Sequence, residues 1–380
     1  MTVAEAVFLA ASAALLYVLV LYPVVLGILR RLSSRAVQRG SELPAVSVVV
    51  PVHNGEAFLE AKLRSLMALD YPKDRLEILV ASDGSTDGTN EIATRFPGVR
   101  LLELPSGGKC SALNAAVPLA SGDILFLTDV RQIVDPQSLR CLVRNFADPA
   151  VGAVSGNLKI RGAEPGESAD IGVYWQFESW IRDSLSALDS MFGATGPFYS
   201  LRRSLFVPIP QDILLDDMYL PLSLFRRGFR LIVDSDAVAW DIPTSLDTEF
   251  RRKVRTLAGN YQLLTYYPWL LTPANRMWFH FMSYKMGRLL LPWILMAIAG
   301  SSLFLPSPWR ALVLAPQLAA YALAAAHPLL PRSLRRITSP LRTFAVMMLA
   351  VLGGLQVFFV PARKLWKVTG ATALPPAPSK

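Results

Sequence analysis

The fold of this chain is decided by residues 46–89, which read VSVVVPVHNGEAFLEAKLRSLMALDYPKDRLEILVASDGSTDGT. Two short apolar runs, 46–50 and 78–80, are rich in β-branched residues, which is typical of parallel strands buried on both faces. The segment between them has helical spacing and is long enough for a right-handed crossover. In an open α/β sheet, ligands bind beyond the carboxyl ends of the strands. The turn-forming polar residues of this stretch, 53–56 and 83–87, are predicted to lie there.

The turn SDGSTDGT, residues 82–89, has two interpretations. Asp and Gly are common turn formers, so the turn can simply cap the next helix, with Asp87 or Thr89 as N-cap. Paired with PVHNGE at the first strand end, however, it closely resembles the nucleotide-binding half of a family 2 glycosyltransferase of GT-A fold. The resemblance covers about residues 46–261 and extends to the hyaluronan, chitin and cellulose synthase-like superfamily. It implies an α/β domain with a Rossmann-like mixed sheet that binds a nucleotide-diphospho-sugar.

Composition indicates a membrane protein with one soluble domain. Hydrophobic residues make up 52% of the 380 residues, which is high for a soluble enzyme. Residues 3–29 are apolar apart from Glu5 and long enough to cross a bilayer. A cleaved signal peptide is the competing interpretation, but the run is too long, no basic region precedes it, and arginines follow it.

Three more apolar runs lie toward the other end of the chain and complete the predicted domain order. That order is an N-terminal transmembrane helix (1–30), a GT-A catalytic domain (41–262), an interfacial segment (263–288), transmembrane helices (289–305 and 311–330), a transmembrane or interfacial helix (343–360) and a disordered Pro-rich tail (368–380).

The net charge of +9 fits a membrane surface better than a nucleic acid. Lys and Arg gather beside the apolar segments, as the positive-inside rule describes, and such clusters also bind anionic membrane lipids. No aromatic-interleaved basic stripe of the kind that stacks bases is present, so we expect no nucleic-acid partner. The arginines after the first span, Arg30 to Arg39, predict a cytoplasmic catalytic domain on a bacterial inner (plasma) membrane. Basic residues flank the last apolar run on both sides, so the sequence is compatible with either three or four membrane spans. It does not indicate the oligomeric state.

The first two strand ends supply the predicted nucleotide pocket. Asp83 can accept a hydrogen bond from the imide N–H of uracil, and the resemblance implies that the matching acid contacts the base. The family often carries an acid at the position of Gly55, a charge that Glu56 can supply here. The same pocket is expected to be lined by Pro51, Val52, His53, Asn54 and Glu56.

Two further segments carry charges suited to a diphosphate. Gly107 and Gly108 permit close backbone approach before Lys109, whose point charge suits a phosphate. A solvated lysine at a helix start is the alternative, but the segment resembles the lysine-bearing loop of the family. A third buried strand, 124–128, ends in Asp129 and resembles the family's metal strand.

The metal strand departs from the usual Asp-x-Asp ending, because Leu127 stands where the first acid is expected. A single carboxylate can still hold Mg²⁺ or Mn²⁺, since the diphosphate and water supply other oxygens. The alternative is that Asp129 merely caps the strand end.

Asp216 and Asp217 at an expected helix start resemble an acid–Asp pair of the family, and the resemblance implies that the second member, Asp217, is the catalytic base. Two adjacent carboxylates point in different directions, so one can face the acceptor while the other is held structurally. A neighbouring negative charge raises the pKa of either, which suits a general base. The preceding loop resembles the family's acceptor-proximal loop, which makes Gly196 and Phe198 acceptor residues.

Residues 250–259 stand where processive members of the family carry Gln-x-x-Arg-Trp. Arg252 replaces the glutamine, Arg255 keeps the arginine, and Thr256 replaces the tryptophan. Arg252 and Arg255 lie one helical turn apart, so both can clamp the diphosphate. A basic helix at the lipid headgroups is the alternative.

The sequence therefore predicts an inverting membrane glycosyltransferase that moves a sugar from a UDP-sugar or other NDP-sugar to a lipid-linked or glycan acceptor. Within the same class, a processive polysaccharide synthase coupled to export is the alternative, although the missing tryptophan weakens it. A catalytically inactive saccharide-binding or scaffold protein is the alternative from another class. The joint presence of Asp83, Asp129 and Asp217 argues against it.

Overall fold

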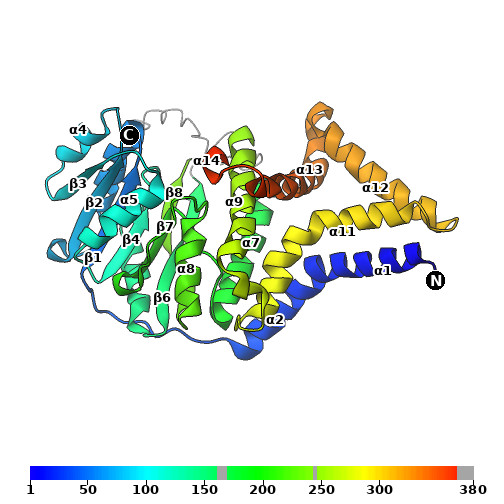
Figure 1. Ribbon diagram of the computed structural model, residues 1–380, viewed down its shortest axis with the longest axis horizontal. Coiled ribbons are helices and arrows are strands. Elements are labelled where there is room, and N and C mark those ends of the chain that lie inside the picture. The colour runs from blue at the N-terminus through cyan, green and yellow to red at the C-terminus, as the bar shows by residue number, and fades with distance from the viewer. Residues whose placement is uncertain (161–168, 243–245, 366–380) are drawn as a thin grey trace. The chain divides into compact units, whose positions relative to one another are not determined.

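The computed structural model describes residues 1–160, 169–242 and 246–365, and it divides the chain into two compact units (Figure 1). The helical unit comprises Met1–Leu32, Pro165–Ile181 and Ser245–Leu365. The sheet unit comprises Ser33–Glu164 and Arg182–Thr244. One helix, α7 (Ala169–Leu188), begins in the helical unit and ends in the sheet unit.

The described part of the sheet unit forms an eight-stranded mixed sheet of order β3-β2-β1-β4-β7-β6-β8-β5. Its strands are β1 (Val46–Val52), β2 (Leu76–Asp83), β3 (Val99–Leu104), β4 (Ile124–Thr128), β5 (Ile133–Val134), β6 (Val151–Ile160), β7 (Phe198–Arg202) and β8 (Arg230–Asp241). Strand β7 runs antiparallel to both of its neighbours, whereas β1 to β4, β6 and β8 share one direction. Their carboxyl ends define one edge of the sheet, called here the carboxyl edge. The opposite side is the amino edge.

The strands predicted at 46–50, 78–80 and 124–128 lie within β1, β2 and β4. Every residue of β1 is buried, as its continuous β-branched run predicts. The predicted crossover is α3 (Glu56–Met67), which buries Leu59, Leu63 and Leu66 in the main core of the sheet unit. Further helices of this unit are α4 (Thr89–Thr94), α5 (Lys109–Ala116), α6 (Ser138–Val143) and α8 (Asp216–Arg226). The predicted α/β class with a mixed Rossmann-like sheet is confirmed.

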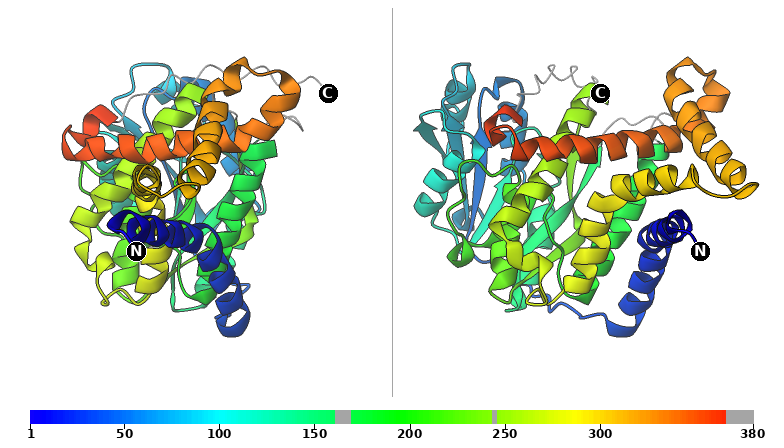
Figure 2. Two further views of the ribbon diagram at one scale, coloured as in Figure 1. Left: turned by 90° about the vertical axis from the view of Figure 1, so that its right-hand side faces the viewer. Right: turned by 45° about the vertical axis from the view of Figure 1, so that its right-hand side comes forward.

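The helical unit holds the apolar helices from both ends of the chain. Its helices are α1 (Val3–Leu16), α2 (Tyr22–Ser33), α9 (Leu246–Tyr266), α10 (Trp278–His280), α11 (Gly287–Ser302), α12 (Trp309–Ala326), α13 (Arg332–Gly354) and α14 (Ala362–Leu365). Within this unit α1 lies beside α11, and α13 contacts α9 and α12 (Figure 2).

Three helical segments of the described chain are long and apolar enough to cross a membrane: Val3–Ser33, Trp309–Leu329 and Thr338–Phe358. Apolar helices near both ends of the chain are therefore present, as predicted. The predicted span at 289–305 falls mainly in α11, which has 16 residues, and stays a prediction. The predicted tail, 368–380, lies outside the described residues.

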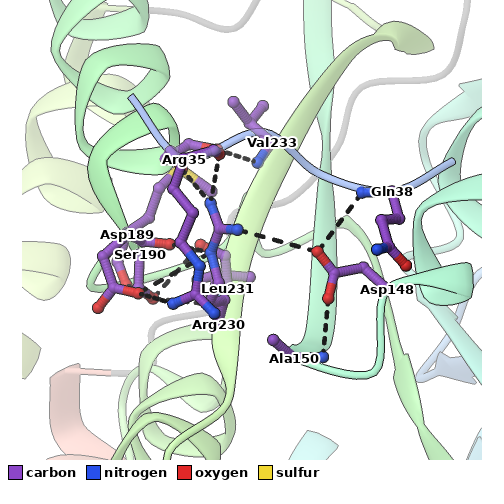
Figure 3. A network of polar contacts seen from close by, with 11 residues as sticks. Arg35, Gln38, Asp148, Ala150, Asp189, Ser190, Arg230, Leu231 and Val233 are labelled. Carbon is purple, nitrogen blue, oxygen red and sulfur yellow. Dashed lines mark hydrogen bonds and ion pairs between the residues drawn. The ribbon is translucent and has the colours of Figure 1, made fainter. Parts of the chain in front are cut away.

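A buried arginine organises the amino edge of the sheet (Figure 3). Arg230, at the start of β8, is fully buried and donates hydrogen bonds to the carbonyl oxygens of Asp189, Ser186 and Arg35 at 2.7, 3.0 and 3.2 Å. Its Nη1 lies 4.0 Å from Asp148 Oδ2. One side chain thus joins β8 to the end of α7 and to the segment that leads into β1.

Candidate active site

At the carboxyl edge, Lys109 lies between two carboxylates. Its Nζ is 3.0 Å from Asp129 Oδ1, directly after β4, and 3.1 Å from Asp216 Oδ2, the first residue of α8. The side chains of Lys109, Asp129 and Asp216 are 20%, 38% and 6% exposed. Burial alone would lower the pKa of the Lys109 ammonium, but Asp129, Asp216 and Asp217 outweigh it and raise that pKa well above its usual value. Lys109 is therefore a permanent cation at physiological pH.

The loop that presents Lys109 is fastened by Asp83. The carboxylate of Asp83 accepts hydrogen bonds from the backbone N–H of Gly107 at 2.6 Å and of Gly108 at 2.9 Å. Gly108 has φ of +86°, a left-handed conformation that favours glycine, and it directly precedes α5. Asp83 was expected at the uracil base. Its contact with the lysine loop is a feature that the sequence pattern did not reveal.

The two predicted nucleotide-binding strand ends are tied together by local hydrogen bonds. Asn54, with φ of +49°, accepts at Oδ1 from the backbone N–H of Thr86 at 2.8 Å. Glu56 donates its backbone N–H to Asp87, and its carboxylate accepts from the backbone N–H of Gly88 at 3.1 Å.

The remaining residues predicted for the nucleotide pocket lie at the same strand ends. His53 Nδ1 is 2.6 Å from the carbonyl oxygen of Asp83, and Pro51 is buried within β1. His53, Asn54 and Glu56 are exposed. The predicted pocket residues therefore meet at the carboxyl edge, while their contacts with a nucleotide stay predictions.

The adjacent acids Asp216 and Asp217 diverge, as predicted. Asp216 is buried against Lys109, whereas Asp217 is half-buried and faces the loop before β7. A Cβ atom added to Gly196 would lie 2.7 Å from Asp217 Oδ2, so a larger residue at this position would displace this carboxylate. The backbone N–H of Ala194 also donates to the carbonyl oxygen of Asp217 at 2.8 Å. Asp217 is thus the acid that lies against the predicted acceptor loop.

Comparison with known proteins decides the family of this site. Residues 47–207 match the family model for Glycosyl transferase family 2. The chain carries a family 2 glycosyltransferase domain. The matched residues include β1, β2, β4, the lysine loop and Gly196, so the predicted resemblance is confirmed.

Two curated relatives of the glycosyltransferase domain come from bacteria. The chain is 28% identical over 239 residues to poly-beta-1,6-N-acetyl-D-glucosamine synthase of Staphylococcus aureus (strain COL), which covers 59% of this chain and 56% of the relative. It is 26% identical over 240 residues to the probable glycosyltransferase YdaM of Bacillus subtilis (strain 168), covering 58% of this chain and 56% of that protein. The chain thus spans about half the length of these curated relatives.

A solved structure shares the fold over nearly the whole chain. The mannosyltransferase PcManGT from Pyrobaculum calidifontis, solved in complex with GDP-Man and Mn²⁺, superposes with a TM-score of 0.75 at 23% sequence identity. The match covers 94% of this chain and 99% of that chain. This likeness confirms the GT-A fold of the glycosyltransferase domain.

One predicted acceptor residue of the domain lies in the core instead. Phe198 is fully buried, and its ring packs edge-on against Phe126 with 5.5 Å between ring centroids. A Cβ atom on Gly156 would fall 1.8 Å from the Phe198 ring, so the backbone at Gly156 lies against this ring. The assignment of Phe198 to acceptor contact is therefore corrected to core packing. Phe198 belongs to the main core cluster of the sheet unit.

Lys62 of the glycosyltransferase domain is a charged residue that sequence reasoning missed. It is fully buried, and its Nζ donates to Thr128 Oγ1 at 2.6 Å and to the carbonyl oxygen of Gln132 at 2.8 Å. Burial lowers the pKa of Lys62 to about 7, although the charge of Asp129 acts in the opposite direction. A signal was present, because Lys62 stands on the apolar face of α3 between Leu59 and Leu66.

An ion pair also fixes the segment after Asp129. Arg131 donates from Nε and Nη2 to the two carboxylate oxygens of Asp241 at 2.8 and 2.7 Å. Asp241 is buried at the end of β8, so this pair ties the segment after β4 to another strand of the carboxyl edge. Such bidentate pairs are geometrically specific, and this one was not evident from sequence.

Two other predicted residues, Arg252 and Arg255, lie on α9 in the helical unit. Their action on the diphosphate stays a prediction. Among the described residues, no three His, Cys, Asp or Glu side chains form a metal-binding group. Asp129 is half-exposed and presents a hard oxygen ligand at the carboxyl edge, which fits a cation whose other ligands are substrate oxygens and water.

Proposed function

We propose that this protein is an inverting, membrane-anchored glycosyltransferase that moves a sugar from an NDP-sugar to a membrane-associated acceptor. The observation that carries the proposal is Lys109, which is held between Asp129 and Asp216 beside Asp217 at the carboxyl edge. We propose a UDP-sugar as donor and a lipid-linked or glycan acceptor. The name of the Staphylococcus aureus relative, a poly-N-acetylglucosamine synthase, supports a role in polysaccharide or glycoconjugate synthesis.

The proposed reaction is an in-line displacement at the anomeric carbon. Asp217 takes the proton of the acceptor hydroxyl as that oxygen attacks. The bond between the anomeric carbon and the diphosphate oxygen breaks, and negative charge collects on the departing nucleoside diphosphate. The permanent charge of Lys109 stabilises this leaving group, because its position is fixed before the reaction begins. Asp83 contributes by holding the loop that carries Lys109.

Charge balance supports a divalent cation. Asp129, Asp216 and Asp217 together carry more negative charge than Lys109 and Lys62 can offset, and a diphosphate adds further negative charge. We propose that Asp129 holds Mg²⁺ or Mn²⁺ together with diphosphate oxygens and water. A cation bound there supplies Lewis-acid neutralisation of the leaving group. The similar PcManGT was solved with Mn²⁺, which supports this proposal.

The proposed function is tested with purified protein in detergent and a panel of UDP- and GDP-sugars. Nucleotide release is scored with Mg²⁺ and with Mn²⁺. We expect at least one donor to support turnover that rises when an acceptor-containing membrane extract is added. The absence of nucleotide release from every donor under these conditions would overturn the proposal and favour a saccharide-binding or scaffold role.

A processive synthase is the second candidate, and the similarity to a polymer synthase favours it. Against it stands Thr256, which replaces the tryptophan of the processive signature and removes a stacking surface for a nascent chain. We therefore propose the addition of one or a few sugars. Product sizing after limited turnover with excess acceptor separates the two, because a distributive enzyme makes short products first. Long polymer with nearly all acceptor unused would establish the synthase instead.

We further propose an orientation with the sheet unit in the cytoplasm, based on the arginines that follow the first apolar helix. Single cysteines placed at Thr2 and at Ser307 should react with an impermeant reagent from the outer face. A cysteine at Ser106 should react only after the cells are opened. Labelling of position 106 in intact cells would reverse the orientation.

A further inference from the structure

Arg182, on the part of α7 that belongs to the sheet unit, is anchored by two hydroxyl groups. Its Nη2 donates to Thr195 Oγ1 at 2.8 Å and to Ser155 Oγ at 3.1 Å. Both partners are neutral, and within the described residues no carboxylate lies within ion-pair distance of this half-buried guanidinium. The charge of Arg182 is therefore not balanced where the structure places it.

The hydroxyl groups are themselves fixed, so the guanidinium is held in one place. Thr195 Oγ1 donates to the carbonyl oxygen of Gly156 at 3.0 Å, and Ser155 Oγ accepts the backbone N–H of Thr195 at 2.8 Å. An arginine has five N–H groups, and two of them bind these hydroxyls. The N–H groups on Nε and Nη1 have no hydrogen-bond partner among the described residues. They are available to an anion.

The guanidinium of Arg182 lies beside the predicted acceptor loop, not beside the lysine loop proposed to bind the donor diphosphate. Ser155 pairs with Tyr199 across β6 and β7, near the end of β7 that lies at the carboxyl edge. Thr195 directly precedes Gly196, the residue that passes against the carboxylate of Asp217. Arg182 is thus anchored to the loop that contacts the proposed base, whereas Lys109 contacts two other acids, Asp216 and Asp129.

We propose that Arg182, anchored by Ser155 and Thr195, binds a phosphate group of the acceptor. The inference rests on the proposed glycosyl transfer and narrows its acceptor to a molecule that carries a phosphate near the reacting hydroxyl. Guanidinium groups bind phosphate by strong charge-assisted hydrogen bonds, and Arg keeps its charge at every physiological pH. For a protein with helices able to cross a membrane, that phosphate comes from a phospholipid headgroup or from a polyprenyl diphosphate carrier.

The test compares acceptors that differ in the phosphate. One pair is phosphatidylglycerol against diacylglycerol, and the other is polyprenyl-diphosphate-linked N-acetylglucosamine against an uncharged alkyl N-acetylglucosaminide of similar length. The full chain in detergent is assayed with the donor that supports nucleotide release. We expect the wild type to prefer the phosphate-bearing member of at least one pair, and the pair that responds identifies the source of the phosphate.

The variant Arg182→Gln should raise KM for the preferred acceptor by about 10- to 100-fold, the range expected for a lost charged hydrogen bond. KM for the donor and the slow release of nucleotide without acceptor should stay unchanged. Arg182→Lys should recover part of the preference because it keeps the charge. Arg64→Gln, which removes an exposed arginine of α3 paired with Glu60, is the matched control and should behave as wild type.

Two results would overturn the inference while leaving the proposed function intact. In one, the wild type uses charged and uncharged acceptors equally. In the other, Arg182→Gln raises the KM for donor as much as that for acceptor, which would give Arg182 a donor-binding or structural role. Failure of the proposed function itself is distinct, because the wild type would then release no nucleotide from any donor.

Discussion

Lys109 and Arg230 are buried or nearly buried cations at opposite edges of the same sheet, and their partners differ in kind. Lys109, at the carboxyl edge, contacts carboxylates at 3.0 and 3.1 Å and remains 20% exposed. Arg230, at the amino edge, is fully buried and donates to backbone carbonyl oxygens, while Asp189 Oδ1 lies 3.8 Å from its Nε (Figure 3).

We interpret this difference as one between a structural cation, Arg230, and a cation proposed to act in catalysis, Lys109. Arg230 donates hydrogen bonds to carbonyl groups that burial would otherwise leave unpaired, so its removal should lower the stability of the folded protein. Lys109 is surrounded by more negative charge than its own charge balances. It lies at the edge where ligands of α/β sheets bind. We proposed above that a divalent cation and an anionic substrate bind beside it. Partners and accessibility, more than burial, therefore distinguish the two roles.

The largest effect on turnover is expected at the proposed base, Asp217, and it tests the role given to the carboxyl edge. Asp217→Asn removes the proton acceptor but preserves shape, so transfer should fall by about 10³-fold or more. Binding of UDP, measured by calorimetry in the presence of Mn²⁺, should change only a few-fold because the base acts on the acceptor. A variant that keeps most of its activity would place the base elsewhere.

A somewhat smaller effect is expected from removal of the divalent cation. EDTA should stop turnover, and excess Mg²⁺ or Mn²⁺ should restore it. Asp129→Ala should lower turnover by about 100-fold and weaken metal-dependent UDP binding, because one fixed ligand is lost. If turnover is undiminished in EDTA, side-chain cations alone neutralise the diphosphate, and the charge argument for the carboxyl edge fails.

The smallest effect on turnover and stability is expected at Lys62. This residue is buried as deeply as Arg230 but lies near the carboxyl edge. Its ordinary pKa of 10.5 falls to about 7 in the folded protein. Between these values the unfolded chain binds the additional proton, so stability rises as pH increases from about 7 to about 10, and the full cost of burying the charge applies below pH 7.

Lys62→Met should therefore raise the melting temperature by a few degrees at pH 6, and the gain should shrink toward pH 10. Turnover should fall several-fold, since the hydrogen bond to Thr128 beside Asp129 is lost. Melting curves of both proteins across this pH range, in one detergent, give the answer. A gain that is independent of pH would show that the Lys62 charge is not what limits stability.

Much of the site could be predicted from sequence because parallel topology brings strand ends together. Once 46–50, 78–80 and 124–128 are taken as parallel strands, Asp83, Asp129 and the polar turn after β1 must share one edge. The lysine loop and the Asp216–Asp217 pair followed from their resemblance to family motifs. These predictions depend on local pattern and on a single topological rule.

The features that were missed depend on side chains that meet across long separations in the sequence. Lys62 contacts Thr128, 66 residues away, and Arg131 contacts Asp241, 110 residues away. Local periodicity does not predict either contact. Its one signal is the charge of Lys62 on the apolar face of α3. Phe198 was misassigned because motif resemblance located the loop correctly but could not give the direction in which the first residue of β7 points.

The most direct test of the account measures stability and turnover together for Lys109→Met and Arg230→Met. Lys109→Met should keep a melting temperature close to that of wild type and lose about 10²- to 10³-fold in transfer, because a preorganised charge is removed. Arg230→Met should lose about 3 kcal/mol of stability, since buried carbonyl groups lose their donors, yet keep near-normal turnover per folded molecule at low temperature. The opposite pattern, with Lys109→Met unstable but active and Arg230→Met stable but inactive, would contradict the assignment of the carboxyl edge as the site of glycosyl transfer.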